Sequence, residues 1–569
     1  MTLCNRRSVL GGGAATLAAA GWPARVCARG DPRSADLIIT NARVYTMEPA
    51  APKAEAFAVR DGRIIAVGAA DSVAGLKGPG TELLDARGMT VVPGFIDCHL
   101  HPEGETLLYE VLVGNPFEVE FVTIDSIIAK LRERAAKTPP GQWVEGYFYD
   151  DTKVKDGRLI TRADLDRVST AHPVAVYHRG GHTSFYNSKA FELAGITNNT
   201  PQPFGGTFDR DPSGNLTGRV TDNAQDVLAK VGKRPRFTDA EKFRRAKAGL
   251  AHISKQFARY GLTTVHHEGG NFSALLEVRD DGNLMHRVSY EADDSMLQAM
   301  IANGWRTGFG DEWIRLGATS EHIVDGSFSE RTMAIRAGYP NRVPLYHGNV
   351  TTTQADLDSW VERVWRAGIQ PNCHTNGDVA IGMYLKALER AQRLFPRRDV
   401  RPKFTHATLA YPDLIARMKA LDAVPACFTS YAYYNPDKFK FYGEALMQHM
   451  MPYRSYLDAG IRVAGGSDFP PGPFAPLMGI QGMVTRTGWN GERWGANQRV
   501  SVPEALGIFT RNGAYNSHEE QRKGSIAAGK LADFVVLADD PHTVDPTRIK
   551  DIQIVRTVAG GRTTYAAAA

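Results

Sequence analysis

The stretch Val91-Val92-Pro93-Gly94-Phe95-Ile96-Asp97-Cys98-His99-Leu100-His101 is an apolar run that ends in two histidines separated by one residue. Side chains alternate along a strand, so His99 and His101 face the same side if the run is a strand. Two imidazoles that project together can bind one divalent metal ion. Taken alone, the same pair is also compatible with structural histidines, so the rest of the chain has to decide.

Outward from this run, short apolar segments alternate with helical stretches, a pattern that predicts an α/β fold with a parallel sheet or barrel. Eight candidate strands can be counted, and polar residues stand at the carboxyl ends of most of them, where (β/α)8 barrels place their active sites. We therefore expect a TIM-like barrel. The candidate strands are 90–97, 263–267, 287–291, 314–324, 370–374, 403–406, 424–428 and 462–468.

The regions outside these strands predict two additions to a barrel over 89–490. Residues 103–260 are too many for one βα connection and predict an inserted capping subdomain that shapes the substrate pocket. Short strand-like segments in 31–88, one of them folded back at Asp61-Gly62, resemble others in 491–569, where a helix precedes them. We expect the two chain ends to pair into one small composite β-sandwich domain.

Further candidate ligands end other apolar runs. His374 follows Gln370-Pro-Asn-Cys, His406 follows Lys403-Phe-Thr, and Asp468 follows Gly465-Gly-Ser. One such residue is more often structural, but five at four expected strand ends favour a metal site over chance.

These motifs together resemble the amidohydrolase superfamily. The resemblance rests on Pro-Gly-Phe-Ile-Asp-x-His-x-His, the later His, His and Gly-Ser-Asp, and the tail Gly524-Ser-Ile-Ala-Ala-Gly-Lys-Leu-Ala-Asp-Phe-Val-Val-Leu537. His182 with Asn187, the stretch 207–224 and Asp325-Gly-Ser327 are similar to amidohydrolase family 3, in the subgroup that includes N-substituted formamide deformylases. The similarity spans nearly all of the chain after residue 30.

The resemblance implies a divalent metal cofactor, zinc in the first place, with one or two ions. It places His99 and His101 on a first metal, His374 and His406 on a second, and Asp468 near the first as a ligand and proton shuttle. The family often has a carboxylated lysine on the fourth strand, whereas this chain aligns Glu321 there. Glu321 either bridges two metals by its own carboxylate, which we favour, or the bridge is lost and one metal remains.

Three more residues are candidates for substrate contact. The family pattern places His182 and Asn187 near the substrate, while a loop histidine satisfied inside the insert is an equal alternative for His182. His267 stands where relatives more often have an aspartate. It touches substrate in one interpretation and is a hydrogen-bonded structural histidine in the other. Neither His267 nor Glu268 is counted among the expected metal ligands.

The expected activity is hydrolysis of an amide-type C–N bond, in an N-acyl or N-formyl amine or amino acid, by a metal-bound hydroxide. Asp468 would accept the proton and deliver it to the leaving nitrogen. The same chemistry permits a hydrolase of cyclic amides, ureas or esters, or a deaminase. The absent lysine also allows a binding or regulatory protein with reduced activity.

The first thirty residues and the composition predict where the protein is located and which partners it has. Asn5-Arg6-Arg7 followed by an apolar, Ala/Gly-rich run up to Gly21 resembles a twin-arginine export signal over residues 1–30, which predicts a periplasmic or secreted protein. The run is short for a membrane anchor, so stable membrane insertion is not expected. A formal charge of +5 over 569 residues, with no phosphate loop, gives no support to nucleic-acid binding. We expect a small-molecule substrate, and a homodimer is possible by analogy with relatives.

Overall fold

Buried parallel strands form the centre of the structure, a computed structural model that describes residues 34–340 and 342–568. They lie in two arcs, ordered β17-β16-β15-β8 and β18-β19-β20-β21-β22. Backbone hydrogen bonds join the arcs at both edges, from Thr319 N to Gln370 O (3.0 Å) and from Asp468 N to His99 O (2.9 Å). Helices cover the outside, so the strands are buried on both sides and are apolar over most of their length. The barrel-type α/β architecture expected from the sequence is confirmed.

The elements of the barrel alternate along the chain. The strands are β8 (Phe95–Leu100), β15 (Leu262–Glu268), β16 (Arg287–Ala292), β17 (Ile314–Thr319), β18 (His322–Ile323), β19 (Asn372–Thr375), β20 (Lys403–His406), β21 (Val424–Phe428) and β22 (Ala464–Gly466). The main helices are α7 (Asp239–Arg259), α8 (Phe272–Asp280), α9 (Asp294–Asn303), α10 (Gln354–Arg366), α11 (Asp378–Leu394), α12 (Pro412–Ala420) and α17 (Pro476–Thr485). The longest, α7, begins with a capping box in which Thr238 and Glu241 satisfy each other's backbone N–H groups.

Two strand expectations need correction. The run 90–97 is not one strand, because the strand is interrupted at Gly94. The backbone there packs so closely that a Cβ on Gly94 would lie 2.0 Å from Thr263 Oγ1. The first half of the run, β7 (Thr90–Pro93), joins a different sheet, and the barrel strand β8 starts at Phe95 and runs through His99. The expected strand 314–324 is likewise divided into β17 and β18. The interruption falls on Ser320 and Glu321, so the direction of the Glu321 side chain is not set by strand alternation.

Strands from both chain ends form one β domain, as the sequence predicts. Its six-stranded sheet has the order β25-β24-β23-β7-β2-β3, and its four-stranded sheet the order β5-β4-β1-β6. Phe57 and Phe534 meet edge to face in the apolar layer between the two sheets. The strands are β1 (Leu37–Thr40), β2 (Arg43–Tyr45), β3 (Lys53–Ala54), β4 (Ala56–Arg60), β5 (Arg63–Gly68), β6 (Glu82–Asp85), β23 (Phe534–Leu537), β24 (Ile554–Ala559) and β25 (Arg562–Ala566).

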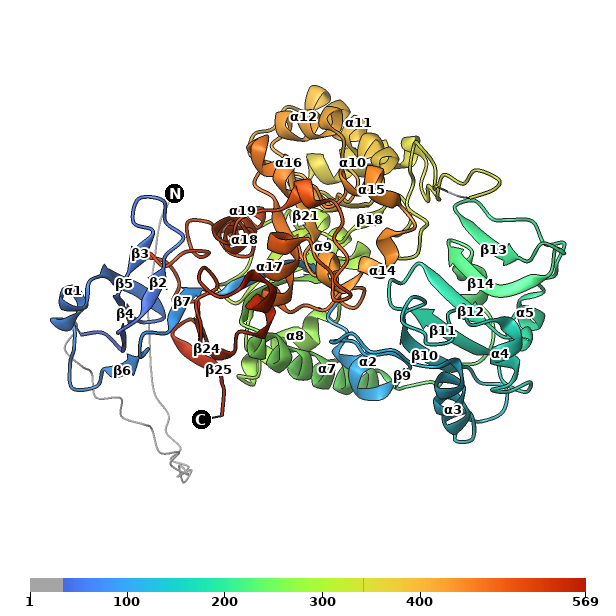
Figure 1. Ribbon diagram of the computed structural model, residues 1–569, viewed down its shortest axis with the longest axis horizontal. Helices are drawn as coiled ribbons and strands as arrows, with labels where there is room; N and C mark the ends of the chain where they lie inside the picture. The colour runs from blue at the N-terminus through green and yellow to red at the C-terminus, as the bar shows by residue number, and fades with distance from the viewer. Residues whose placement is uncertain (1–33, 341, 569) are drawn as a thin grey trace, which may run out of the picture.

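The interval between the first two barrel strands contains a separate six-stranded sheet, ordered β13-β14-β12-β11-β10-β9. The expectation of an insert over 103–260 extends too far, because α7 lies in that interval yet packs against β15 and α8 of the barrel. The insert elements are β9 (Val111–Leu112), α3 (Ile124–Ala135), β10 (Val144–Tyr149), α4 (Arg162–Asp166), β11 (Val174–His178), β12 (Thr183–Tyr186), α5 (Ser188–Ala194), β13 (Gly206–Arg210) and β14 (Leu216–Asp222). Figure 1 shows the β domain, the barrel and the insert side by side along the long axis.

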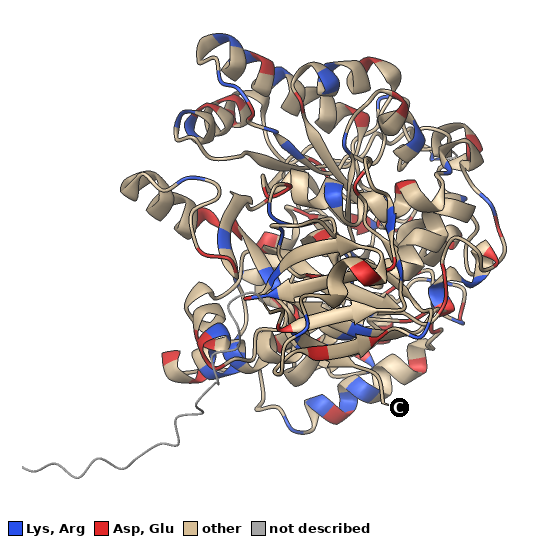
Figure 2. Ribbon diagram, turned by 90° about the vertical axis from the view of Figure 1, so that its left-hand side faces the viewer, with Lys and Arg blue, Asp and Glu red and all other residues tan. Residues whose placement is uncertain are grey.

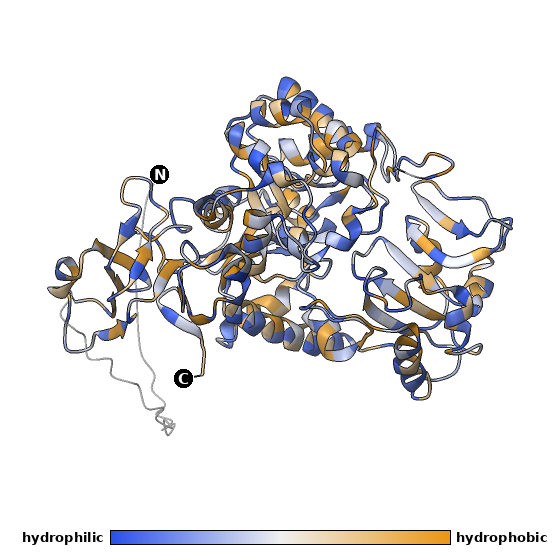
Figure 3. Ribbon diagram, in the orientation of Figure 1, coloured by the Kyte–Doolittle hydropathy of each residue, from blue (hydrophilic) through white to orange (hydrophobic). Residues whose placement is uncertain are grey.

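The exterior is mixed in character. Acidic and basic residues are interspersed over the elements visible in Figure 2, and helices such as α3 and α7 carry both hydrophilic and hydrophobic residues along their length (Figure 3). Within the described residues, no helix combines the length and apolarity needed to cross a bilayer. The proposed export signal, residues 1–30, lies outside the described residues.

Candidate metal centre

Six sequence-predicted residues meet at the carboxyl ends of the barrel strands. His99 lies in β8 and His101 just after it, His374 lies in β19, and His406 ends β20. Glu321 comes from the interruption between β17 and β18, and Asp468 from the segment after β22. Parallel strands bring their carboxyl ends to the same rim, so residues far apart in sequence converge there.

Glu321 occupies the middle of the group. Its Oε2 lies 3.2 Å from His374 Nδ1, 3.4 Å from His406 Nε2 and 3.6 Å from His99 Nε2, and its Oε1 lies 3.9 Å from His101 Nε2. Burial alone would raise the pKa of this carboxyl, but His99 and His374 outweigh burial and hold it well below its usual range. One carboxylate therefore faces all four imidazoles.

Asp468 closes the group on the side of the first pair. Its Oδ1 lies 3.3 Å from His99 Nε2 and 3.4 Å from His101 Nε2. Burial opposes ionisation, yet His406, His101 and His99 together lower the pKa of Asp468. Its backbone adopts φ +53°, a left-handed conformation that aspartate tolerates better than most residues. Hydrogen bonds to the β8 backbone and from Ser467 N to Asp97 Oδ1 hold the turn in place.

The donor set fits a divalent metal ion. The Nε2 atom of His99 is buried without a hydrogen-bond partner, which is costly unless a ligand completes it. Among the described residues, the ion partners of Glu321 and Asp468 are histidines alone, with no lysine or arginine to neutralise them. His99 belongs to three groups of possible ligands whose atoms lie within 4.8 Å of one another, one with Glu321 and His406, one with His101 and Asp468, and one with Glu268 and Glu291. Imidazole and carboxylate donors of this kind are those zinc prefers.

A buried ion pair behind His99 escaped the sequence analysis. Glu291, at the end of β16, and Lys403, at the start of β20, are both fully buried and form a short salt bridge. Glu291 Oε2 lies 3.4 Å from His99 Nδ1, and Lys403 Nζ also donates to Cys98 O at 2.6 Å. Burial would raise the pKa of Glu291, but Lys403 outweighs it and lowers that pKa. A carboxylate behind the ligand orients the imidazole and directs Nε2 to the metal side.

Glu268, which the sequence analysis left aside, lies beside the same centre. Its Oε1 accepts hydrogen bonds from the Glu321 backbone N–H (3.0 Å) and the Ser320 hydroxyl, so it braces the strand interruption. Its Oε2 lies 3.8 Å from His99 Nδ1 and has no hydrogen-bond partner. Burial, followed by the nearby Glu291 and Glu321, raises the pKa of Glu268 to about 8.

His182 reaches the centre from the insert. Its ring centroid lies 4.8 Å from that of His374, and its Nδ1 lies 2.9 Å from Asp222 Oδ1. Its backbone N–H donates to Glu330 Oε1 at 2.9 Å. The structure thus brings His182 next to His374 of the candidate centre, and its contact with substrate stays a prediction.

Asn187 is a correction. Its amide is fully buried inside the insert, where Oδ1 accepts from Val174 N and Ala190 N and Nδ2 donates to the carbonyls of Ser169 and His172. It caps α5 and ties it to the sheet. No hydrogen-bonding capacity is left for substrate, so the expected substrate contact at Asn187 is wrong.

His267 is a second correction. Strand alternation turns it away from the rim, toward the helices, where its Nε2 lies 2.8 Å from His286 Nε2 and its ring meets Phe257. Burial lowers the pKa of His267 to about 3. The alternative of a hydrogen-bonded structural histidine is therefore the one that the structure supports, and the substrate contact is wrong.

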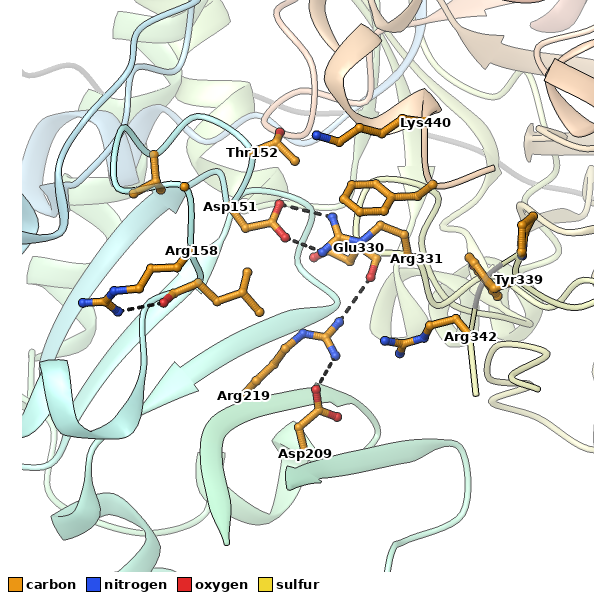
Figure 4. Close-up of a pocket in the computed structure, with 15 residues that line it drawn as sticks. Asp151, Thr152, Arg158, Asp209, Arg219, Glu330, Arg331, Tyr339, Arg342 and Lys440 are labelled. Carbon is orange, nitrogen blue, oxygen red and sulfur yellow. Dashed lines mark hydrogen bonds and ion pairs between the residues drawn. The ribbon is translucent and has the colours of Figure 1, made fainter. Parts of the chain in front are cut away.

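Two of the cavities that adjoin the insert differ in their relation to the candidate centre. The larger, about 590 Å³, lies beyond Glu330, and no residue of the metal group lines it. Figure 4 shows two of its arginines paired with carboxylates, Arg331 with Asp151 and Arg219 with Asp209. The smaller, about 400 Å³, opens directly on His101, whose side chain is 33% exposed. Access to the centre is therefore on the His101 side.

Comparison with known proteins identifies the family to which this chain belongs. Residues 82–565 match the sequence profile of the amidohydrolase family. The chain belongs to the amidohydrolase family. It is 29% identical to N-substituted formamide deformylase of Arthrobacter pascens over 552 residues, which cover 93% of this chain and 98% of that protein. It is also 29% identical to YtcJ of Bacillus subtilis (strain 168), over 92% of this chain and 98% of that protein.

A solved structure extends the comparison to the fold of this amidohydrolase. An uncharacterized metal-dependent hydrolase from Pyrococcus horikoshii OT3 superposes with a TM-score of 0.68 at 20% identity, covering 90% of this chain and 99% of that one. The family match includes all six residues of the candidate centre. The protein is thus a hydrolase acting on carbon–nitrogen bonds, in the family that the sequence motifs resemble.

Proposed function

We propose that this amidohydrolase cleaves the amide-type C–N bond of an N-acyl or N-formyl amine at a zinc-type centre formed by the six residues. The observation that carries the proposal is the central position of Glu321, within 3.2–3.9 Å of four imidazoles, beside a buried and unpartnered His99 Nε2. The similarity to an N-substituted formamide deformylase over almost the whole chain supports the same substrate class.

The residues divide into two ligand sets with one shared member. His99, His101 and Asp468 would hold a first ion, His374 and His406 a second, and Glu321 would bridge them. A divalent metal ion bound there would lower the pKa of the water it binds and polarise the carbonyl oxygen of the substrate. Metal analysis of wild type and Glu321→Gln tests the bridge: we expect two ions per chain to fall to one or none. One ion in both proteins would contradict it.

Asp468 would carry the proton in the reaction. As a carboxylate it accepts a proton from the water that attacks the carbonyl carbon. The protonated Asp468 then gives this proton to the nitrogen as the C–N bond breaks, which yields a carboxylic acid and an amine. His101 stands at the open side of the centre, where the smaller cavity begins.

The deciding experiment is a substrate screen with metal-replete protein. N-formyl and N-acetyl amines, N-formyl amino acids, hydantoins and simple esters are compared by release of amine or acid. We expect amine release from open-chain amides. Cleavage of cyclic ureas or esters alone would overturn the proposed substrate class, and no cleavage of any compound would favour a binding protein.

We also propose export through a twin-arginine route, on the strength of the motif near Arg6-Arg7. Fractionation of the native host, with replacement of both arginines by lysine as the matched variant, tests it. Processed protein in the exported fraction, lost in the variant, is the expected result. Full-length protein in the cytoplasm of both strains would contradict it.

A further inference from the structure

The contacts that hold His182 in the insert leave one of its ring nitrogens free. Its backbone N–H donates to Glu330 Oε1 at 2.9 Å, and its backbone carbonyl accepts from the Asp222 N–H at 2.8 Å. Its Nδ1 lies 2.9 Å from Asp222 Oδ1, and because a carboxylate oxygen only accepts, Nδ1 carries the hydrogen of this bond. Backbone and ring of His182 are therefore both fixed, and Nε2 is the ring atom that remains.

The ring of His182 lies against the candidate centre. Its centroid is 4.8 Å from that of His374. The side chain of His182 is 16% exposed, whereas those of the expected ligands His374 and His406 are each 3% exposed. Among the described residues, none forms a hydrogen bond with His182 Nε2, and this atom is accessible, unlike the buried Nε2 of His99. A free and accessible imidazole nitrogen thus stands beside the residues expected to hold the metal.

Asp222 reaches His182 from an unusual backbone conformation. It ends β14, and its φ of +46° lies in the left-handed region, where residues with a side chain are uncommon. Such conformations persist where the surrounding structure imposes them, and they cluster at functional sites. The Asp222 side chain is 1% exposed, and its Oδ2 accepts from Asn349 Nδ2 at 2.6 Å. Asn349 lies in the barrel segment between β18 and α10, so one buried carboxylate joins the insert, the barrel and the His182 ring.

We propose that Asp222 is a positioning residue of the reaction, which fixes the His182 ring so that Nε2 hydrogen-bonds the amide group of the substrate. Among the described residues the ion partner of Asp222 is His182, and no lysine or arginine pairs with it. A carboxylate on one nitrogen of a histidine sets the tautomer and the direction of the other nitrogen. A hydrogen bond held in place beside the metal ligands orients the amide for attack, and a small misplacement there lowers the rate strongly. The inference rests on the proposed function and adds to it a residue that does not touch the substrate.

Asp222→Asn is the informative substitution. Asparagine tolerates the left-handed conformation and has the size of aspartate, so the fold is expected to persist, which thermal unfolding checks. Its amide can also donate to Nδ1, so it no longer selects the tautomer of His182. With N-pentylformamide and the metal-loaded enzyme, we expect kcat/KM to fall about 10–100-fold, as it does in His182→Gln. Asp211→Asn, at the turn between β13 and β14 of the same hairpin, is the matched control and is expected to leave kcat/KM unchanged.

The double variant separates positioning from a merely structural effect. Because Asp222 acts through His182, adding Asp222→Asn to His182→Gln is expected to lower kcat/KM by no more than about a further twofold. Independent effects would instead multiply, to a loss of about 10²–10⁴-fold, and that result would overturn the positioning role. An unchanged kcat/KM in Asp222→Asn would overturn it as well.

A measurement without turnover separates this inference from the proposed reaction. It uses nuclear magnetic resonance of the metal-loaded Asp468→Asn variant with isotope-labelled histidine Cε1, in which the His182 signal is identified by its absence after His182→Gln. We expect N-pentylformamide to shift this signal, and Asp222→Asn to abolish the shift.

The outcomes of the two experiments are distinct. If the His182 signal shifts in this way but the wild type cleaves no amide, the positioning of His182 stands and the proposed function fails. If amides are cleaved while N-pentylformamide moves other histidine signals and not that of His182, the inference is wrong and the proposed function stands. No cleavage and no shift of any histidine signal would overturn both.

Discussion

At the scale of single residues, the centre depends on groups placed on both sides of one imidazole. His99 turns Nε2 toward Asp468 and Glu321 and Nδ1 toward Glu291, which Lys403 keeps ionised. The second nitrogen of a ligating histidine commonly has such an acceptor, because it sets the tautomer and ring orientation. Glu291 and Lys403 therefore orient the His99 imidazole for a metal ion that neither of them would contact.

Glu291→Gln is expected to lower the free energy of unfolding by about 3–5 kcal/mol, because Lys403 would be left buried without its counter-charge. Zinc affinity is expected to fall about 10–100-fold as well, because His99 loses its charged acceptor. Urea unfolding and competition with a zinc indicator measure the two effects.

The double variant Glu291→Leu with Lys403→Met is the control for that prediction. Replacement of both charges by apolar groups is expected to restore most of the stability while zinc affinity stays low. Recovery of both quantities together would show that Glu291 has no role in orienting His99.

Asp468→Asn tests the proton transfer. An amide cannot take up and return the proton, so kcat is expected to fall about 10²–10⁴-fold, while metal content by atomic absorption and the thermal midpoint change little. Unchanged turnover in the metal-loaded variant would remove Asp468 from the proposed mechanism.

At the scale of elements, two glycines let α2 (Gly104–Tyr109) approach α7 and thereby shape the cavity beside His101. A Cβ at Gly104 would lie 2.0 Å from Gly249 O, and a Cβ at Gly249 would lie 2.5 Å from Glu105 N. Both contacts are with backbone, which cannot rotate away. The close approach places Glu103 and Glu105 at the mouth, so the packing of these helices positions the cavity wall.

Gly249→Ala is expected to push α2 outward and to cost about 1–3 kcal/mol of stability through overpacking. KM should rise for every substrate that enters beside His101, with the metal content unchanged. Gly382→Ala on α11 is the matched control, because its Cβ would meet only Leu414 Cδ2 at 3.9 Å. Equal behaviour of the two variants would show that the α2–α7 contact does not shape the cavity.

At the scale of the whole molecule, strands from both chain ends and a barrel strand are tied together. The buried ion pair between Arg287 of β16 and Asp533, with Nε to Oδ2 at 2.8 Å, links the barrel to the strand that pairs with β7. From the insert, His182 reaches the barrel rim, where its ring centroid lies 4.8 Å from that of His374. The centre therefore needs the ring of strands and the insert in their native places.

Metal removal is expected to act on the molecule as a whole. A ligand that binds only the folded state stabilises it by about 4 kcal/mol at a thousand times its Kd, so dialysis against a chelator should lower Tm and abolish activity. Restored Tm and activity on addition of zinc, followed by calorimetry, complete the test. An unchanged Tm with full activity after verified metal removal would contradict a metal centre at the six residues.

The sequence by itself determined the barrel class, the pairing of the chain ends and the identity of all six candidate ligands. Apart from Glu321, which came from the family resemblance, these follow from local patterns, because buried parallel strands are apolar and their ends carry the chemistry. Tertiary structure alone decided which face each side chain takes and which distant charges meet. His267 and Asn187 are polar residues at positions that suggested substrate contact. The side chain of His267 instead faces the outer helices, and the amide of Asn187 is fully hydrogen-bonded to backbone groups. Glu291, Lys403 and Glu268 gain their importance only through partners far along the chain. Such contacts arise when the barrel closes, and no local pattern encodes them.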